Sequence, residues 1–401
     1  MRICMAGMLL GVLITAGMAQ DSPPWMRPDL APPPTPEEVG QTWIEIDGQV
    51  YGAVPDELGP IGGGEGYSRI ITEGDHNVST IEELLEALAQ AQSGEVVYLD
   101  PAGDFDVTTL VYAEDNFMLA IPEGVTLASN RGHEGSRGAI IHSGHFGTRL
   151  ILVQGPNVRI TGLWLMGPDP KWRIDHHRRS FSAEARERHA KTWPDAPSPA
   201  SKYYYLLPTS RAIRTASDAL EVDNCELSGW TIAVSLGNGV GHHVHHCYIH
   251  HNQRHGLGYG VGHDPPYDGS GRAESITEYN LFNYNRHSLK SSGAPGAGYE
   301  TRHNVELGVS RSAPVDMHGG RDRRDDTDIA GDWMKVHHNT FRCSPRAIGI
   351  RGVPRQQAEI HSNWFYQDEP GPGTIGPWPP TEENHLIVGK NAYGLQNPVV
   401  Y

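Results

Sequence analysis

The hydrophobic and polar positions of this chain change their period once. Residues 79–94, STIEELLEALAQAQSG, place apolar residues at helical spacing, with Ser79 and Thr80 as alternative N-caps and Gly94 as the stop signal. Beyond this segment the apolar residues come in short β-type runs separated by turns, starting with EVVYLD and FMLAIP. The pattern predicts one amphipathic helix near the start of the folded part and strands after it.

From residue 220 onward the strands repeat one local pattern. The segments LEVDNCELSGW, HHVHHCYIHHN, SITEYNLFNYN, YETRHNVELGV, MKVHHNTFRCS and AEIHSNWFYQD align into a single column that holds Cys225, Cys247, Asn280, Asn304, Asn339 and Asn363. The separations of 22, 33, 24, 35 and 24 residues suggest a coil of 22 to 24 residues that sometimes carries an extra loop. Apolar residues three places before the column and two places after it should point inward, although Glu306 breaks the second rule.

The early helix, the asparagine column at a tight turn and the coil length resemble the right-handed parallel β-helix proteins of the pectate-lyase-like superfamily. The resemblance covers residues 66–401 and implies an all-β fold: a single-stranded right-handed parallel β-helix with an N-terminal capping α-helix. Residues 167–211, which contain a predicted helix at SAEARERHAKTW and three consecutive tyrosines, interrupt the coil pattern as a long insertion.

The N-terminal residues predict export. Residues 1–19 combine one basic residue, an apolar run and small residues at a cleavage point, as a signal peptide does, and residues 20–65 are a Pro/Gly-rich linker or an arm over the body. Loss of Arg2 with the signal changes the formal charge from -16 to -17, which excludes a global attraction for nucleic acid. We expect a secreted or periplasmic monomer, peripheral to a membrane at most, without a disulfide scaffold.

A second strand follows the turn in each coil and predicts a polar surface cluster. The strands AVSLG, GLGYG, SLKSS, PVDMHG and AIGIRG should turn these residues inward: Val234, Leu236, Leu257, Tyr259, Leu289, Ser291, Val315, Met317, Ile348 and Ile350. A floor of Ser235, Gly237, Gly258 and Gly260 should face outward. It leads to Lys290, Asp316, His318 and Arg351, which become neighbours because parallel strands lie about 4.8 Å apart.

SLKSSG also resembles the Lys-Ser stretch of polysaccharide lyases of the alginate lyase and chondroitinase B type. The resemblance implies Lys290 as the base and Arg351 or His318 as the second proton-transfer group. Arg351, however, lies two coils from Lys290 instead of one, and Asn283 and Asn285 stand where the family has calcium-binding glutamates. Ca2+ therefore stays an open candidate, and no other cofactor is indicated.

The chemistry of β-elimination suits these residue types. A uronate α-proton is weakly acidic, so a cation must neutralise the carboxylate while a base removes the proton. Lys290 would need a lowered pKa, which neighbouring cations could supply, whereas His318 titrates in the useful range unaided. We expect further contacts to the anionic polysaccharide from His287, Arg286, Arg302, His337, Arg346 and Trp172.

Three alternatives share this surface. A glycoside hydrolase would need a second carboxyl beside Asp316, from Asp325, Asp326 or Asp328 in the loop that follows. A uronate epimerase would share the proton abstraction, and a non-catalytic glycan-binding protein would use the cluster only as solvated sheet surface. Separately, the histidine-rich segment HHVHHCYIHHNQRH is either a polar sheet face or, through His243 and His245 near Asp223, a metal site.

Overall fold

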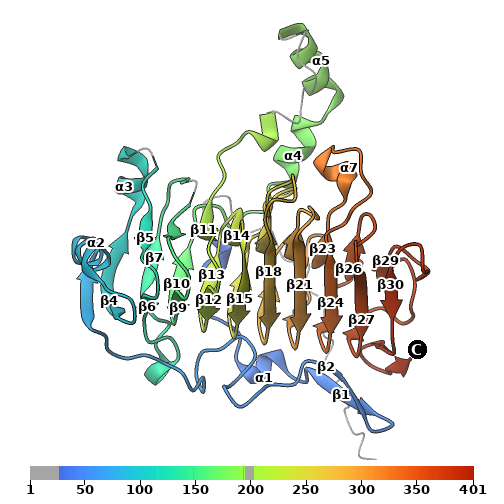
Figure 1. Ribbon diagram of the computed structural model, residues 1–401, viewed down its shortest axis with the longest axis horizontal. Coiled ribbons are helices and arrows are strands. Elements are labelled where there is room, and N and C mark those ends of the chain that lie inside the picture. The colour runs from blue at the N-terminus through green and yellow to red at the C-terminus, as the bar shows by residue number, and fades with distance from the viewer. Residues whose placement is uncertain (1–26, 115, 148, 193, 195–202) are drawn as a thin grey trace, which may run out of the picture.

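The protein is mostly β and is built from large parallel sheets. The computed structural model describes residues 27–114, 116–147, 149–192, 194 and 203–401, so the predicted signal peptide lies outside the described residues. The chain winds through stacked coils that contribute strands to three parallel ladders (Figure 1). This arrangement agrees with the expected all-β architecture.

The three ladders have the following members. The first ladder contains β3 (His76–Thr80), β4 (Val96–Asp106), β6 (Thr126–Ala128), β9 (Arg159–Thr161), β12 (Glu221–Asp223), β15 (Gly239–His245), β18 (Ala273–Glu278), β21 (Ala297–Arg302), β24 (Trp333–His337), β27 (Gln357–His361) and β30 (Leu386–Val388). The second contains β7 (Ile140–His142), β10 (Trp164–Met166), β13 (Glu226–Ser228), β16 (Tyr248–His250), β19 (Leu281–Asn283), β22 (Val305–Glu306), β25 (Thr340–Phe341), β28 (Trp364–Phe365) and β31 (Ala392–Tyr393), closed by the antiparallel β32 (Val399–Val400). The third contains β5 (Leu119–Ile121), β8 (Ile151–Val153), β11 (Arg211–Thr215), β14 (Ile232–Leu236), β17 (Tyr259–His263), β20 (His287–Ser291), β23 (Val315–Met317), β26 (Ile348–Ile350) and β29 (Ile375–Gly376).

Helix α2 (Ile81–Gln90) covers the N-terminal end of the stack, as the sequence predicts (Figure 1). Thr80 is the N-cap: its hydroxyl accepts from the Glu83 backbone N–H at 3.2 Å, and the Glu83 carboxylate accepts from the Thr80 N–H at 3.2 Å. Leu84 and Leu88 of this helix are buried in the main core. The N-cap and the apolar face together explain why this segment is helical. Because the helix covers the first coil, the stack of strands ends there.

The predicted column is a continuous hydrogen-bonded ladder inside the turn between the first and second ladders. Each backbone N–H of the column donates to the side chain of the next coil, from Cys225 to the Cys247 Sγ at 3.4 Å and from Asn304 to the Asn339 Oδ1 at 3.0 Å. The ladder continues one coil beyond the predicted column, to Asn391. The residue before each member has a left-handed backbone, with φ between 50° and 56°, which turns the chain sharply: Asn224, His246, Tyr279, His303, His338 and Ser362.

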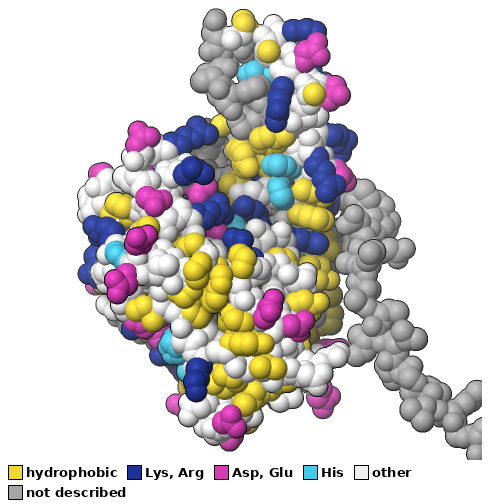
Figure 2. All heavy atoms as spheres, turned by 90° about the vertical axis from the view of Figure 1, so that its right-hand side faces the viewer, with side chains coloured by type: hydrophobic (Ala, Val, Ile, Leu, Met, Phe, Trp, Pro, Cys, Tyr) yellow, Lys and Arg dark blue, Asp and Glu magenta, His cyan; other side chains and the backbone are white. Residues whose placement is uncertain are grey.

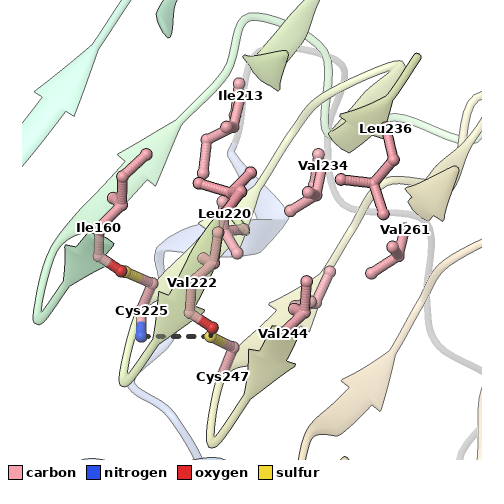
Figure 3. Close-up of a cluster of buried hydrophobic side chains, with 14 of the residues drawn as sticks. Ile160, Ile213, Leu220, Val222, Cys225, Val234, Leu236, Val244, Cys247 and Val261 are labelled. Atoms are coloured by element: carbon pink, nitrogen blue, oxygen red, sulfur yellow. Dashed lines mark hydrogen bonds between the residues drawn. The ribbon is translucent and has the colours of Figure 1, made fainter. Parts of the chain in front are cut away.

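The interior is filled by the residues that the column predicts. Val222 and Val244 pack one above the other along the stack beside Cys225 and Cys247 (Figure 3), all within one buried cluster. Glu306 also points into this core, in register with Phe282 and Phe341 of the neighbouring coils. The irregular residue therefore marks a buried glutamate and not a break in the register.

The register of the third ladder is confirmed for four coils and wrong for one. Lys290 pairs with Asp316, and Asp316 with Gly349, as predicted. In the remaining coil the strand is β17, not GLGYG: Val261 fills the core position, and Gly262, not Gly258 or Gly260, stands beside Lys290. Tyr259, predicted to face inward, instead lies beside the His287 ring at 5.7 Å, and Leu257 is in the preceding turn.

The predicted N-terminal arm runs along the bottom of the stack in Figure 1. It contains η1 (Pro28–Leu30), α1 (Pro36–Val39) and the antiparallel hairpin of β1 (Trp43–Ile46) and β2 (Gln49–Gly52). It is fixed by bonds to the turns, among them Ala53 N–H to the Thr340 hydroxyl at 3.1 Å and Gly64 N–H to Asn224 Oδ1 at 2.8 Å. The arm is therefore part of the folded body.

The insertion stands above the stack and carries α4 (Ile174–Ser180) and α5 (Ala183–Thr192), the latter close to the predicted helix (Figure 1). Short helices α3 (Thr108–Ala113), η2 (His133–Gly135) and α7 (Gly320–Arg323) lie in other loops. Figure 2 shows apolar side chains on the C-terminal end of the stack. The exposed apolar residues of the last coils are Tyr366, Ile387, Val399 and Tyr401. Among the described residues, no helix has the length and apolar character needed to span a bilayer.

Candidate functional site

The outer face of the third ladder brings together the four residues predicted as catalytic. Lys290 lies on β20 and Asp316 on β23, and His318 and Arg351 directly follow β23 and β26. Asp316 is the centre of the group. Its Oδ2 lies 2.7 Å from Arg351 Nη2 and 2.8 Å from His318 Nε2, while its Oδ1 accepts from Arg351 Nε at 3.1 Å.

The charge of Asp316 is fixed by these neighbours. Burial alone would raise the pKa of its carboxyl, but the polar neighbours on this face, with Arg351 as the permanent cation among them, outweigh burial and hold the pKa well below the usual range. A Cβ at position 349 would lie 3.0 Å from Asp316 Oδ1, so the glycine there leaves the carboxylate its space. Asp316 is thus an ionised, buried anchor for a histidine and an arginine.

His318 is the titratable group that remains poised for proton transfer. Burial lowers its pKa, and Asp316 only partly compensates, so the ring is neutral at neutral pH. Its Nε2 is at ion-pair distance from Asp316, although the ring is not aligned for a hydrogen bond. A neutral imidazole beside an ionised carboxylate is the arrangement expected of a general base.

Lys290 is a permanent cation, contrary to the lowered pKa that its proposed role as base requires. Its ammonium group contacts the Asp264 carboxylate and lies 5.3 Å from the centre of the Tyr259 ring. Burial alone would lower the pKa of Lys290, but Asp264 and Tyr259 outweigh burial and raise it. Since no unprotonated amine is present at neutral pH, Lys290 is suited to bind an anion or donate a proton.

His287 completes the buried part of the cluster. Its Nδ1 lies 2.5 Å from the Ala313 carbonyl oxygen, which can only accept, so this nitrogen carries the proton. Nε2 is then unprotonated and faces Asp316 Oδ2 at 3.7 Å without a hydrogen-bond partner. Burial lowers the pKa of His287 to about 3, so the ring stays neutral over the ordinary pH range.

Two other predicted contacts border this cluster on the same face. Arg286 donates to the Tyr259 hydroxyl at 3.4 Å. Arg346 is exposed and lies against Gly376, the neighbour of Gly349 on the ladder. Both guanidinium groups are therefore available to an anionic ligand that follows the third ladder.

Three predicted substrate contacts lie elsewhere. Arg302 and His337 are on β21 and β24 of the first ladder, where Arg302 pairs with Glu278 at 2.5 Å and His337 contacts Glu300 at 3.2 Å. The two ladders form different sides of each coil, so these side chains do not join the Lys290 cluster. Trp172 packs against the Arg311 guanidinium at 4.3 Å and attaches the insertion to the body.

Two acidic residues of the cluster, Asp264 and Asp322, are not indicated by the sequence pattern. Asp264 directly follows β17, which ends at His263 and not at Gly260, where the predicted strand GLGYG ends. Asp322, at the start of the loop after β23, contacts Arg351 at 3.0 Å, whereas the acids considered for this role lie farther along; Asp325, for example, pairs with Arg323 at 2.7 Å. The helical turn α7 that brings Asp322 back has no clear signal in the sequence.

The site does not offer a ligand set for Ca2+. Ca2+ prefers six to eight oxygen ligands, but Asn285 is buried in an internal asparagine pair with Asn252. His287, Asp316 and His318 do present three donor atoms within 4.8 Å of one another, a nitrogen-rich set. Arg351 contacts the carboxylate of that set through Nε and Nη2, so a metal ion there would compete with this ion pair.

Comparison with known proteins adds a likeness of fold. No family model matches the sequence, and no curated protein matches it. The solved structure of an alginate lyase from Paenibacillus sp. str. FPU-7 is similar, with a TM-score of 0.50 and 13% sequence identity, over 78% of this chain and 98% of that chain. At this identity the likeness concerns the fold alone.

Proposed function

We propose that the protein is an exported polysaccharide lyase that cleaves a uronic-acid-containing glycan by β-elimination on the outer face of the third ladder. The observation that carries the proposal is the pairing of one neutral histidine, held by Asp316, with two fixed cations, Lys290 and Arg351. We also propose a right-handed parallel β-helix of the pectate-lyase-like superfamily and a monomeric enzyme. The fold likeness to an alginate lyase supports this choice of reaction class.

The proposed reaction gives each group one task. Arg351 neutralises the uronate carboxylate, which makes the proton on the adjacent carbon more acidic. His318 removes that proton. The electron pair of the broken carbon–hydrogen bond forms the new carbon–carbon double bond, and the glycosidic carbon–oxygen bond breaks, its electrons leaving with the oxygen. Lys290, kept protonated by Asp264, donates a proton to the departing oxygen.

The same geometry disfavours a glycoside hydrolase. Such an enzyme needs one carboxyl that is protonated at its working pH to assist the leaving group. The pKa values of Asp264 and Asp316 are both lowered below the usual range, because each carboxylate faces cations. Both stay ionised, so neither provides the required acid.

The test is a screen of anionic polysaccharides, beginning with alginate, with product detection by two methods. A lyase creates a conjugated unsaturated uronate that absorbs in the ultraviolet, in step with new reducing ends. His318→Asn and Lys290→Met should each lower the rate by at least about 100-fold, the usual contribution of an acid–base group. Lys335→Met and His361→Gln, on the first ladder, are matched controls that should retain activity.

Different products would identify the alternatives. Reducing ends without the ultraviolet chromophore would indicate hydrolysis, and altered uronate configuration without chain shortening would indicate an epimerase. Glycan binding that survives replacement of Lys290, Asp316, His318 and Arg351, without any product, would reduce the cluster to a solvated surface. Each of these results refutes the lyase proposal.

A further inference from the structure

The histidine-rich segment forms a second cluster on the outer face of the first ladder, away from the proposed active site. His243 and His245 lie on β15, two residues apart, with ring centres 4.1 Å apart and nearly parallel planes. Glu221 of β12 contacts His245 Nε2 at 3.1 Å, and Glu278 of β18 contacts His243 Nε2 at 2.7 Å. Two imidazoles from one strand are thus flanked by carboxylates from both neighbouring strands.

We propose that this cluster is a structural binding site for a divalent first-row transition metal, of which zinc is the best fit. Glu221, His243 and His245 each offer one donor atom, and the three atoms lie within 4.8 Å of one another. Two imidazole nitrogens and a carboxylate form a ligand set typical of zinc and unsuited to calcium or magnesium. Glu278 is then either a fourth ligand or the carboxylate that orients the His243 ring.

The surroundings allow an ion to enter and remain. The His243 side chain is 36% exposed and that of Glu221 27%, while the His245 side chain is 1% exposed, so the site opens to solvent on one side and is fixed on the other. The His246 ring holds the far side of His245, with their Nδ1 atoms 3.0 Å apart. The second histidine is therefore oriented before any ion arrives.

Glu221 has two cationic neighbours, Arg69 and Arg159, and the nearer one, Arg69, can move away. Arg69, the residue that contacts Glu221 Oε1 at 2.6 Å, belongs to the N-terminal segment and its side chain is 38% exposed. Arg159 lies farther from Glu221, with its Nε 3.7 Å from Oε2, and its nearer partner is Asp223 at 2.7 Å. A bound ion would replace Arg69 on Glu221 and link β12, β15 and, through Glu278, β18.

A related position on the same ladder, on β24, lacks the second histidine that the β15 position has. On β24, two strands beyond β18, His337 contacts Glu300 at 3.2 Å much as His245 contacts Glu221. The residue two places before His337 is Lys335, whereas the residue two places before His245 is a second histidine. Among the described residues of the first ladder, only the β15 position combines two imidazoles on one strand with a carboxylate, and His337 therefore offers a matched control.

The test is a calorimetric titration of metal-depleted full-length protein, without a polyhistidine tag, with zinc chloride. Wild type should bind one equivalent, and zinc should raise its thermal unfolding midpoint. His243→Gln and His245→Gln should each weaken binding by at least about tenfold and abolish the thermal shift, whereas His337→Gln should behave as wild type. Cobalt chloride should give a visible absorption band of low-coordinate cobalt in wild type and His337→Gln alone.

Circular dichroism of each variant separates loss of the site from loss of the fold, and Glu221→Gln provides a milder ligand change should a histidine variant fail to fold. Absence of saturable zinc binding, or unchanged affinity in the folded His243 and His245 variants, would overturn the proposal. Binding that is lost in His318→Gln and kept in His245→Gln would overturn it as well, since the ion would then belong to the His287, Asp316 and His318 group.

Discussion

Glu306 provides a quantitative test of the core. Its carboxyl group lies inside the stack, where the Ser288 hydroxyl donates to Oε2 at 2.5 Å and Oε1 has no hydrogen-bond partner. Burial raises its pKa to about 8 from the ordinary value of 4.5. The folded protein therefore holds this group as a neutral acid at neutral pH, while the unfolded chain releases the proton.

The magnitude follows from linkage. Between the unfolded pKa of 4.5 and the folded pKa of about 8, only the folded state keeps the proton, so stability falls by about 1.4 kcal/mol per pH unit. The loss amounts to about 3 kcal/mol at pH 7 and levels off at about 5 kcal/mol above pH 8. Glu306→Gln stays neutral at every pH and keeps a partner for Ser288, so it should remove this loss.

The assay is equilibrium urea unfolding of wild type and Glu306→Gln at pH 5, 7 and 9, followed by tryptophan fluorescence. The variant should match wild type within about 1 kcal/mol at pH 5 and exceed it by about 3 kcal/mol at pH 7 and about 5 kcal/mol at pH 9. Glu123→Gln, an exposed glutamate, is the control and should show no growing difference. A pH-independent difference between Glu306→Gln and wild type would refute the inference that this acid is buried and neutral.

Three further predictions concern the active site and the asparagine ladder. Activity should be lost as pH falls through the pKa of His318, which burial lowers. Because Asp316 raises the pKa of His318, Asp316→Asn should move this acid limb of the pH–rate profile to still lower pH. An acid limb that does not move would contradict the assignment of His318 as the base. Asp264→Asn should lower the pKa of Lys290 and so move the alkaline limb to lower pH, whereas a limb that stays in place would exclude Lys290 as the acid. The Asn339 side chain accepts two hydrogen bonds and donates three inside the asparagine ladder. Asn339→Ala should therefore lower the free energy of unfolding by about 3–5 kcal/mol, measured by urea titration. A loss of less than about 1 kcal/mol would show that the ladder is not a source of stability.

Part of the proposed active site follows from the sequence repeat alone. The position of Lys290 beside Asp316 follows from strand alternation and from the column that aligns successive coils. Both features can be recognised in the sequence. Because a stacked coil places each residue next to its counterpart one repeat away, the repeat predicts which residues become neighbours. The structure also settles the register at Glu306, which breaks the apolar pattern: this residue pairs with Phe282 of the preceding coil.

Tertiary packing decided which polar side chains contact Lys290 and so fix its protonation state. In the β17 coil both GLGYG and the segment after it are rich in glycine, so alternation gave no unique register, and only the fit of Val261 into the core selects the strand. This strand places Asp264 beside Lys290, and the pKa of Lys290 is therefore raised and not lowered as its role as a base would require. The sequence determined the stack of coils and the face that carries the cluster, since these depend on a period; the three-dimensional packing decided which residues are acids and bases, since pKa values depend on burial and on partners from loops without a period.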